Sequence, residues 1–500
     1  MNSKLINGIR STIAAILHQF TLYPLFMISN IIPFMISYLY QVKKESSPDN
    51  TSSLTQDDGY FIHPIMSLCM SICCFFGGMV EHYLGPKLVI LIGGICIALG
   101  DFLFTVSINL ILDFFINIFF GVGFAIAMTA AVKNATKYFP KKRGLINALA
   151  GGFGGNLGNS FFNLVIKLFV SKGDYPRSED KNMYIKSTAK NYKTFFYIHG
   201  GLVLGVAIIS SLLLVTFKDA DNNNENNKEL DKEQKLIVEN EEKGEKVEIN
   251  EEESREENKD NENNDKNVTK NKNYKKNLKQ IFKHYQIYLI LLIYLFTSFL
   301  QGFIFTVGFN YGTMSHNSSE SADSMSNKKI YPDEMSIIFM INSLVSSLMG
   351  PFFGLLYDIL SFRYTMIMID LISAINGILI NYTVKSGIYL YAISIILNGC
   401  LNSGAFSLIF PHVSKIYGFN FAGELYGFVV LSSGISSIIS SCIYYTLSHF
   451  SEKKDDKSYF HIFIIGASCN IISGILAFFD DEKKFEFSLE GGNDNIIRND

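Results

Sequence analysis

Tryptophan is absent from the 500-residue sequence, and charged residues are scarce over most of its length. Charged residues make up 18% of the chain, below the roughly 25% that is usual in soluble proteins. They are also concentrated, because residues 218–280 hold 14 of the 43 Lys and Arg and 19 of the 46 Asp and Glu. A charge-poor chain with one charged segment is not typical of soluble domains. The net charge of −3 and the lack of a recurring basic face also exclude a nucleic-acid-binding protein.

The seven cysteines and nine histidines lack the spacing of a disulfide framework or a metal site. Every cysteine falls within an apolar stretch, so none is placed to close an external loop. The histidines never repeat at H-x-x-H or H-x-x-x-H spacing, and no serine stands in the G-x-S-x-G setting of a hydrolase. The glycine-rich run at 151–160 lacks the lysine of a phosphate-binding loop and predicts close helix packing. We therefore expect no metal, no cofactor and no enzymatic activity.

Long apolar stretches dominate the rest of the chain. A helix that crosses roughly 30 Å of hydrocarbon needs about 20 apolar residues, and twelve stretches qualify. Six precede the charged segment, at 14–40, 61–81, 88–107, 110–132, 145–169 and 195–217. Six follow it, at 285–309, 335–357, 364–382, 387–410, 424–448 and 459–480. The sequence predicts an all-α polytopic membrane protein with twelve transmembrane helices in two six-helix bundles.

The charge distribution predicts the domain organisation. We expect an N-terminal bundle at 1–217, a charged linker at 218–284, a C-terminal bundle at 285–480 and a tail at 481–500. The linker has too few large apolar residues to offset chain entropy, so we expect a disordered tether rather than a partner-binding domain. Lysine-rich segments at 133–143 and 270–283 lie close to span ends, where basic residues mark the cytosolic side. Both termini and the linker are therefore predicted to be cytosolic.

Short motifs recur in the two halves at an almost constant offset. Glu81 ends the second span and Asp358 ends the eighth, 277 residues later, and each acid stands four residues after a glycine. The stretch 137–144 recurs as 415–423, at offsets of 278 and 279. An acid at a helix end beside a glycine can hold two closely packed helices together at a cytosolic loop. The pattern indicates an internal duplication.

These motifs resemble those of a known transporter family. GGMVEHYLGPK at 77–87 is similar to the loop motif G-x-x-x-D-[RK]-x-G-[RK]-[RK] of the major facilitator superfamily, with Glu81 in place of the Asp. KYFPKKRG at 137–144 resembles the Lys-aromatic-Phe-Pro-x-x-Arg-Gly segment of its oxalate/formate antiporter and monocarboxylate carrier branch. The resemblance implies secondary transport by alternating access. The implied solute is a small organic anion of the pyruvate or lactate type, with proton coupling an open question.

The sequence also departs from that branch. Ser433 stands where the oxalate-type carriers have a lysine in the eleventh span, and the eighth span lacks an acidic-basic pair. Two alternatives therefore stay open. One is a transporter of an amino acid or a drug-like solute, and the other is a membrane sensor or scaffold without transport activity. As partners we expect the solute, the lipid bilayer and, if transport is coupled, protons. We expect a multi-pass monomer in the plasma membrane or an organellar membrane.

The resemblance implies candidate site residues. The loop motifs imply gating roles for Glu81, Lys87, Arg143, Asp358 and Arg363. In this superfamily the first, second, fourth and fifth spans of each half line the pathway. Polar residues there are expected to bind the solute: Tyr23, Asn30, Thr129, Asn147, Tyr294, Gln301, Asn398, Asn402 and Ser433.

Ionisable residues deep in a span are costly and usually serve a function. His18 is the first candidate for proton coupling, because the ordinary pKa of histidine is near 6.5. Asp101 is the second, and Asp370 is weighed behind it. Lys133, Lys167 and His199 lie near span ends, so we expect them to extend toward the membrane surface or to cap a helix.

Overall fold

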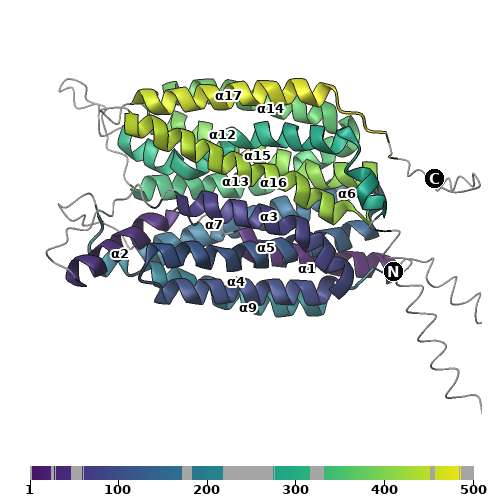
Figure 1. Ribbon diagram of the computed structural model, residues 1–500, viewed down its shortest axis with the longest axis horizontal. Helices are drawn as coiled ribbons and strands as arrows, with labels where there is room; N and C mark the ends of the chain where they lie inside the picture. The colour runs from purple at the N-terminus through teal and green to yellow at the C-terminus, as the bar shows by residue number, and fades with distance from the viewer. Residues whose placement is uncertain are drawn as a thin grey trace, which may run out of the picture. The chain divides into compact units, whose positions relative to one another are not determined.

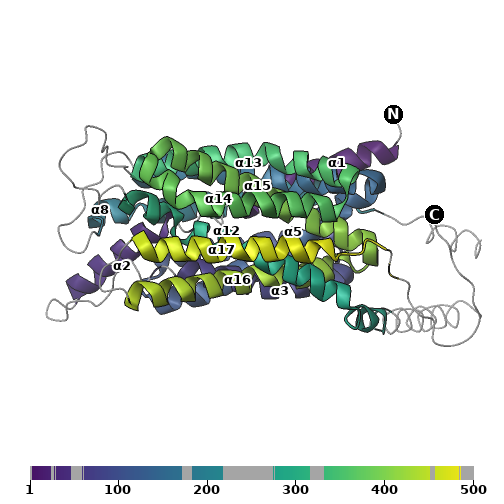
Figure 2. The ribbon, with the colours of Figure 1, turned by 90° about the horizontal axis from the view of Figure 1, so that it is seen from above.

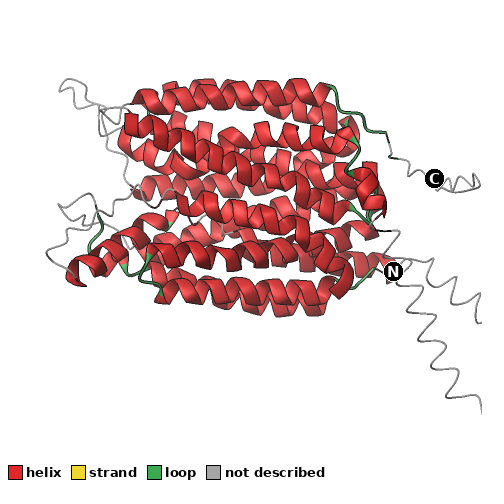
Figure 3. Ribbon diagram, viewed as in Figure 1, coloured by secondary structure: helices red, strands yellow, loops and turns green. Residues whose placement is uncertain are grey.

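The computed structural model describes residues 3–23, 28, 30–46, 59, 61–171, 183–217, 274, 276–315, 332–450, 456–483 and 485. Met1–Thr216 and Gln286–Lys484 form one compact unit, and Phe217–Tyr285 with Phe485–Asp500 form a second. Most of the predicted linker at 218–284 and of the predicted tail at 481–500 lies outside the described residues. The described part of the chain consists of helices and short connections (Figure 3).

The first half of the compact unit contains helices that are drawn from purple to teal-blue in Figure 1. They are α1 (Ser3–Leu22), α2 (Ile32–Ser46), α3 (Ile62–Leu84), α4 (Pro86–Val106), α5 (Leu110–Tyr138), η3 (Pro140–Lys142), α6 (Arg143–Asn147), η4 (Ala148–Gly154), α7 (Gly155–Val165), η5 (Ile166–Ser171), α8 (Lys186–Ala189) and α9 (Tyr192–Leu213). The second half, drawn from green to yellow, contains α12 (Tyr285–Ser315), α13 (Pro332–Leu360), α14 (Phe362–Ser386), α15 (Ile388–Tyr417), α16 (Ala422–Phe450) and α17 (Asp456–Phe478).

Ten helices among the described residues are long and apolar enough to cross a membrane. Their outward faces carry large apolar side chains that a soluble protein would bury, such as Leu212 and Ile359, which are 73% and 77% exposed. The helices run side by side, as the two perpendicular views show (Figures 1 and 2). This arrangement matches ten of the twelve predicted spans.

The first predicted span, 14–40, is not one continuous helix. α1 begins earlier than predicted, at Ser3, and ends at Leu22, and α2 begins only at Ile32. Pro33 stands in the first turn of α2, where its missing N–H group costs no helical hydrogen bond, whereas within one long helix it would break the pattern.

The fifth predicted span, 145–169, is built from α6, η4, α7 and η5, and the two η segments are π-helical. Its glycines face neighbouring helices at very short range. A Cβ atom at Gly152 would lie 3.2 Å from the Cα atom of Gly350 on α13. A Cβ atom at Gly158 would overlap the carbonyl oxygen of Phe20 on α1. The prediction that this glycine run serves helix packing is therefore confirmed.

The two halves meet along two pairs of helical segments. α3 packs against α16, and α13 packs against α6, η4 and α7. The α3–α4, α5–α6, α13–α14 and α15–α16 connections lie at one end of these helices, near the label α6 in Figure 1. We call this the inner end, and the sequence predicts that it is cytosolic. Toward the opposite end, the rings of Phe61 and Tyr445 lie 5.6 Å apart between their centroids.

Candidate functional site

A cavity lies between the two halves of the compact unit. Its volume is about 80 Å³, counted as the space open to the centre of a water molecule. One water needs about 10–15 Å³ on this measure, so the cavity has room for a small solute. Residues of both halves line it, which places a bound solute where relative motion of the halves would expose it to either side.

Five of the nine predicted solute-binding residues line the cavity. They are Tyr23, Tyr294, Gln301, Asn402 and Ser433. The Tyr23 ring packs edge-on against Phe406, with centroids 5.9 Å apart. Phe124 and Phe406 are also part of the lining. The wall therefore combines aromatic faces with hydroxyl and amide groups, a mixture typical of small-molecule sites.

The other four predicted residues do not line the cavity. Asn147 donates a hydrogen bond of 2.6 Å to the carbonyl oxygen of Ser407, which ties α6 to α15. Asn398 donates to the side-chain oxygen of Gln301 and so orients a residue that does line the cavity. Asn30 donates to Asn163 over 2.9 Å. Thr129 is buried, and its hydroxyl has no hydrogen-bond partner among the described residues.

The second and fifth spans were expected to line the pathway, but the residues of α3 and α7 that line the cavity were not among the predicted ones. His63, Ser67 and Ser71 of α3 line it, and so do Asn156 and Asn159 of α7. A signal for α3 was present, because the three polar residues repeat every four positions and therefore share one face of a helix. The π-helical turns ahead of α7 change the rotation of that helix, so no simple spacing predicts its polar face.

The described lining has no ionic side chain, and it contains one imidazole. Among the described residues that line the cavity there is no Lys, Arg, Asp or Glu, and His63 is the one histidine. The hydroxyl groups of Ser298, Ser403 and Ser437 and the thiol of Cys74 complete the polar wall. The cavity can therefore donate and accept hydrogen bonds but offers no fixed charge to neutralise an ion.

Glu81, a predicted gating residue, forms a buried ion pair at the inner end. Its carboxylate lies 2.6 Å from Nζ of Lys133, and the two side chains are 9% and 4% exposed. Lys133 was expected to extend toward the membrane surface or to cap a helix, and that expectation was wrong, because its ammonium is buried against the Glu81 carboxylate of α3. The pair lies against the start of α16, since a Cβ atom at Gly423 would be 3.7 Å from Nζ of Lys133.

Asp358, its counterpart in the second half, binds the first half directly. Its two oxygens accept hydrogen bonds of 3.2 Å from the backbone N–H groups of Gly144 and Leu145. These groups belong to the first turn of α6, where a negative charge is favoured by the free N–H groups of the helix. Arg143 strengthens the junction by donating to the Ser414 hydroxyl over 3.4 Å.

The two remaining predicted gating residues lie apart from these contacts. Lys87 is exposed, and its backbone carbonyl accepts a hydrogen bond of 3.1 Å from Ser211 within the first half. Arg363 donates to the backbone carbonyl of Asp480 and lies over the Phe478 ring, 5.7 Å from its centroid. Arg363 therefore contacts the segment after α17, in its own half.

Asp101 forms a fully buried pair with His199. Nδ1 of His199 lies 2.7 Å from Oδ2 of Asp101, and Nε2 lies 3.0 Å from the carbonyl oxygen of Thr21. Neither side chain is exposed. His199 was expected to extend toward the membrane surface or to cap a helix. It does not reach the surface, but its contact with the carbonyl of Thr21, one residue before the end of α1, caps that helix. Phe162 and Phe195 flank the imidazole and separate it from solvent.

The other two buried candidates differ from this pair. His18 is fully buried on α1, and neither of its ring nitrogens has a hydrogen-bond partner among the described residues. Asp370 accepts hydrogen bonds of 2.8 Å and 2.7 Å from the hydroxyls of Thr297 and Ser473. None of His18, Asp101 and Asp370 lines the cavity.

Comparisons with known proteins agree with this architecture. The model of the family described as Major Facilitator Superfamily matches residues 15–325 and 304–493. The chain is similar to the structure of the proton:xylose symporter XylE bound to 6-bromo-6-deoxy-D-glucose, at 12% identity and a TM-score of 0.63, over 96% of this chain and 97% of that one. It also matches XylE from E. coli in a partially occluded inward-open conformation, at 12% identity and 0.59, over 95% and 99%.

A nucleoside transporter, NupG, is similar at 13% identity and a TM-score of 0.56, over 94% of this chain and 99% of that one. At such identities the likeness shows the fold alone. No curated protein matches the chain. The all-α, twelve-helix fold and the multi-pass membrane location predicted from the sequence are confirmed.

Proposed function

Because the chain belongs to the major facilitator superfamily, we propose that it is a secondary transporter that works by alternating access and binds a small polar solute in electrically neutral form. Membership of this family supports the general activity, the movement of a small solute across a bilayer. The neutral form is either an uncharged polar molecule or a monocarboxylate that enters together with a proton.

The uncharged wall of the cavity carries this proposal. Hydroxyl and amide groups of both halves line it, and the described lining residues include no ionic side chain. An ion inside a membrane protein without a compensating charge costs several kcal/mol. A dicarboxylate would bring two such charges, so this cavity disfavours it. An uncharged molecule, or a monocarboxylate that binds together with a proton, meets no such cost.

Among solutes of this kind, a monocarboxylate of the pyruvate or lactate type is our first candidate. The segment at 137–144 that resembles the monocarboxylate branch supports it, and the amide of Asn402 and the imidazole of His63 supply donors for a carboxylate. The alternative is a larger apolar or drug-like solute, which the aromatic wall of Tyr23, Phe124 and Phe406 favours.

We also propose that the inner-end contacts are the gate. Asp358 binds α6 across the boundary between the halves, and Arg143 binds Ser414 across the same boundary. Both sets of bonds must break when the inner end opens, since their partners lie in different halves. Glu81 supports the gate from the other side, because its ion pair with Lys133 lies against α16.

For proton coupling, the structure supports Asp101 ahead of His18. An ionised Asp101 and the carbonyl of Thr21 are both acceptors, and His199 satisfies both only if both of its ring nitrogens carry hydrogen. Removing that proton leaves one of the two contacts without a hydrogen. Thr21 lies two residues before Tyr23, so a change in this bond acts on the end of α1 that reaches the cavity. Within the described part of the chain, His18 has no comparable partner.

Transport by the purified full-length chain in proteoliposomes tests the proposal. Labelled pyruvate, lactate, oxalate, xylose and a neutral amino acid should be offered with and without a pH gradient and a membrane potential. We expect saturable uptake of a neutral-form solute, and uptake of a monocarboxylate should be electroneutral.

Asn402→Ala should weaken the apparent affinity for the solute about tenfold, the effect of losing one good hydrogen bond. Asn376→Ala, outside the cavity, is the matched control. Preferred uptake of oxalate would contradict the proposal.

A further inference from the structure

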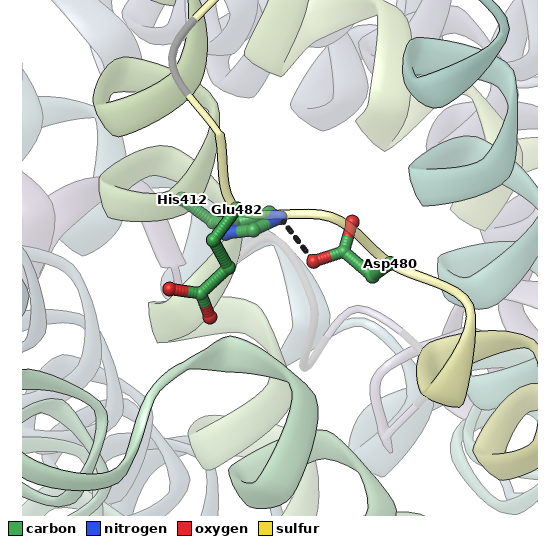
Figure 4. Close-up of side chains that lie close together, drawn as sticks. All are labelled: His412, Asp480 and Glu482. Atoms are coloured by element: carbon green, nitrogen blue, oxygen red, sulfur yellow. Dashed lines mark ion pairs between the residues drawn. The ribbon is translucent and has the colours of Figure 1, made fainter.

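A histidine and two carboxylates meet at the inner end of the second half, outside the central cavity. His412 lies near the end of α15, and Asp480 and Glu482 lie in the segment that follows α17 (Figure 4). One nitrogen or oxygen of each side chain lies within 4.8 Å of those of the other two. His412 and Asp480 are fully buried, and Glu482 is partly buried. We call these three residues the His412 cluster.

The geometry inside the cluster does not fit a hydrogen bond. Nε2 of His412 lies 3.1 Å from Oδ2 of Asp480, as the dashed line in Figure 4 marks. Both atoms are shielded from solvent, yet neither has a hydrogen-bond partner among the described residues. Buried polar atoms are seldom left unbonded, so this arrangement calls for an explanation. Two ligands bound about 2.1 Å from one metal ion lie roughly 3.0–3.4 Å apart, which fits the separation found here.

Surrounding residues hold the cluster in place. Oδ1 of Asp480 accepts a hydrogen bond of 3.4 Å from Gln286, which leaves Oδ2 directed at the imidazole. The carboxylate of Glu482 accepts from the backbone N–H of Phe362 over 2.7 Å and from Lys415 over 2.5 Å. The Phe362 ring stacks on the imidazole, with centroids 3.8 Å apart. Bonds to the outer side of the ligands are typical of metal sites, because they fix the orientation of each ligand.

We propose that His412, Asp480 and Glu482 bind one divalent transition-metal ion, and that zinc fits the donor set. One imidazole nitrogen and two carboxylate oxygens are ligands that zinc accepts, with water completing the coordination. The ion would neutralise the two carboxylates, whose charge Lys415 offsets only in part. It would also fasten residues 480–482 to α15, while the bond from the backbone N–H of Phe362 to Glu482 ties them to the start of α14.

None of the three residues lines the central cavity, so the site does not depend on the transported solute. The spacing of the histidines in the sequence could not reveal it. His412 and Asp480 are 68 positions apart in the sequence, and only the placement of the segment after α17 beside the end of α15 brings them together. A search for ligands on one helix therefore passes over the cluster.

Zinc binding by the purified full-length chain tests the proposal directly. The protein should be stripped with a chelator, dialysed, and titrated with Zn²⁺ under competition from a zinc-binding dye. We expect one tight site per chain and a thermal unfolding midpoint that rises with Zn²⁺. Asp480→Asn and His412→Gln should each weaken this binding at least about tenfold. Asp481→Asn makes the same change of charge one residue away, where Asp481 contacts Lys483, and should bind as the unaltered chain does.

Two results would overturn the proposal. One is the absence of a tight site in the unaltered chain, which would leave the cluster as a His–Asp ion pair. The other is equal zinc affinity in Asp480→Asn, His412→Gln and Asp481→Asn, which would put the ion elsewhere. If His412→Gln fails to fold, Asp480→Asn and Glu482→Gln decide between these results. Neither measurement depends on transport, so failure of the transport proposal would be seen separately.

Discussion

Glu81 and Asp358 hold equivalent positions in the two halves but bind different kinds of partner. Glu81 pairs with Lys133 of its own half, whereas Asp358 binds the backbone of Gly144 and Leu145 in the opposite half. A repeated motif therefore has two uses. In the first half the acid links α3 to α5, a contact that can persist while the halves move. In the second half it closes a junction that must open during transport.

The buried aspartates of the two halves differ in the same way, and they give the largest expected effect. Asp101 pairs with a histidine, whereas among the described residues the side chains that hydrogen-bond to Asp370 are hydroxyl groups. If protons drive transport, Asp101→Asn should abolish uptake driven by a pH gradient while exchange between equal solute pools survives. Asp370→Asn should keep the pH-driven uptake. Proteoliposome uptake with an imposed gradient measures both. Loss of coupling in His18→Gln instead would return that role to His18.

Breaking the ion pair of the first half should strongly affect stability. Glu81→Gln leaves the Lys133 ammonium buried without its partner, which typically costs about 3–5 kcal/mol. The double change Glu81→Gln with Lys133→Gln should recover part of that loss, since no charge remains unpaired. Thermal unfolding in detergent across this double-mutant cycle gives the coupling between the residues. Additive losses would mean that the pair contributes no coupling.

Asp358→Asn should act on turnover, with a smaller effect on stability. The asparagine oxygen accepts one of the two bonds from α6 but carries no charge for the helix N-terminus. We expect turnover to change by about tenfold, or ~1.4 kcal/mol in the barrier, with apparent affinity within a few-fold. Uptake kinetics measure both quantities, and Asp481→Asn is the control. A loss of solute affinity with normal turnover would argue against a gate.

The turns after the two motifs provide a finer test. Gly85 has φ +76°, and Ser361 in the other half has φ +91°, a backbone region that suits glycine alone. Ser361→Gly should therefore stabilise the protein by about 1 kcal/mol, and Gly85→Ala should destabilise it by about 1–2 kcal/mol. A Cβ atom at Gly85 would have no neighbour within 4 Å, so strain in the backbone is the sole cost. Unfolding midpoints measure both changes.

The connection between the halves should matter least. Residues 222–271 lie in the predicted tether, outside the described residues, and their composition cannot form a packed core. Deleting them while keeping the basic stretch before α12 should leave uptake within about twofold. Loss of uptake despite normal membrane insertion would mean that this segment has a role of its own.

The sequence by itself determined the membrane fold. Apolar length sets the number of spans because the bilayer has a fixed thickness, and the repeated acids after Gly77 and Gly354 indicated an internal duplication. The sequence also found five cavity residues, because the family resemblance indicates which spans line the pathway. The sequence predicted one span at 14–40 and not the break between α1 and α2, because the residues that connect the two helices are also largely apolar.

Tertiary structure decided which polar residues meet. Nothing in the sequence joins Asp101 to His199, Glu81 to Lys133 or His412 to Asp480, because each pair comes from segments that are distant along the chain. The physical reason is that in a bundle of apolar helices the relative rotation and depth of each helix follow from close packing at glycines and from buried hydrogen bonds. Those same contacts set the partners of every ionisable group, and hence its chemistry.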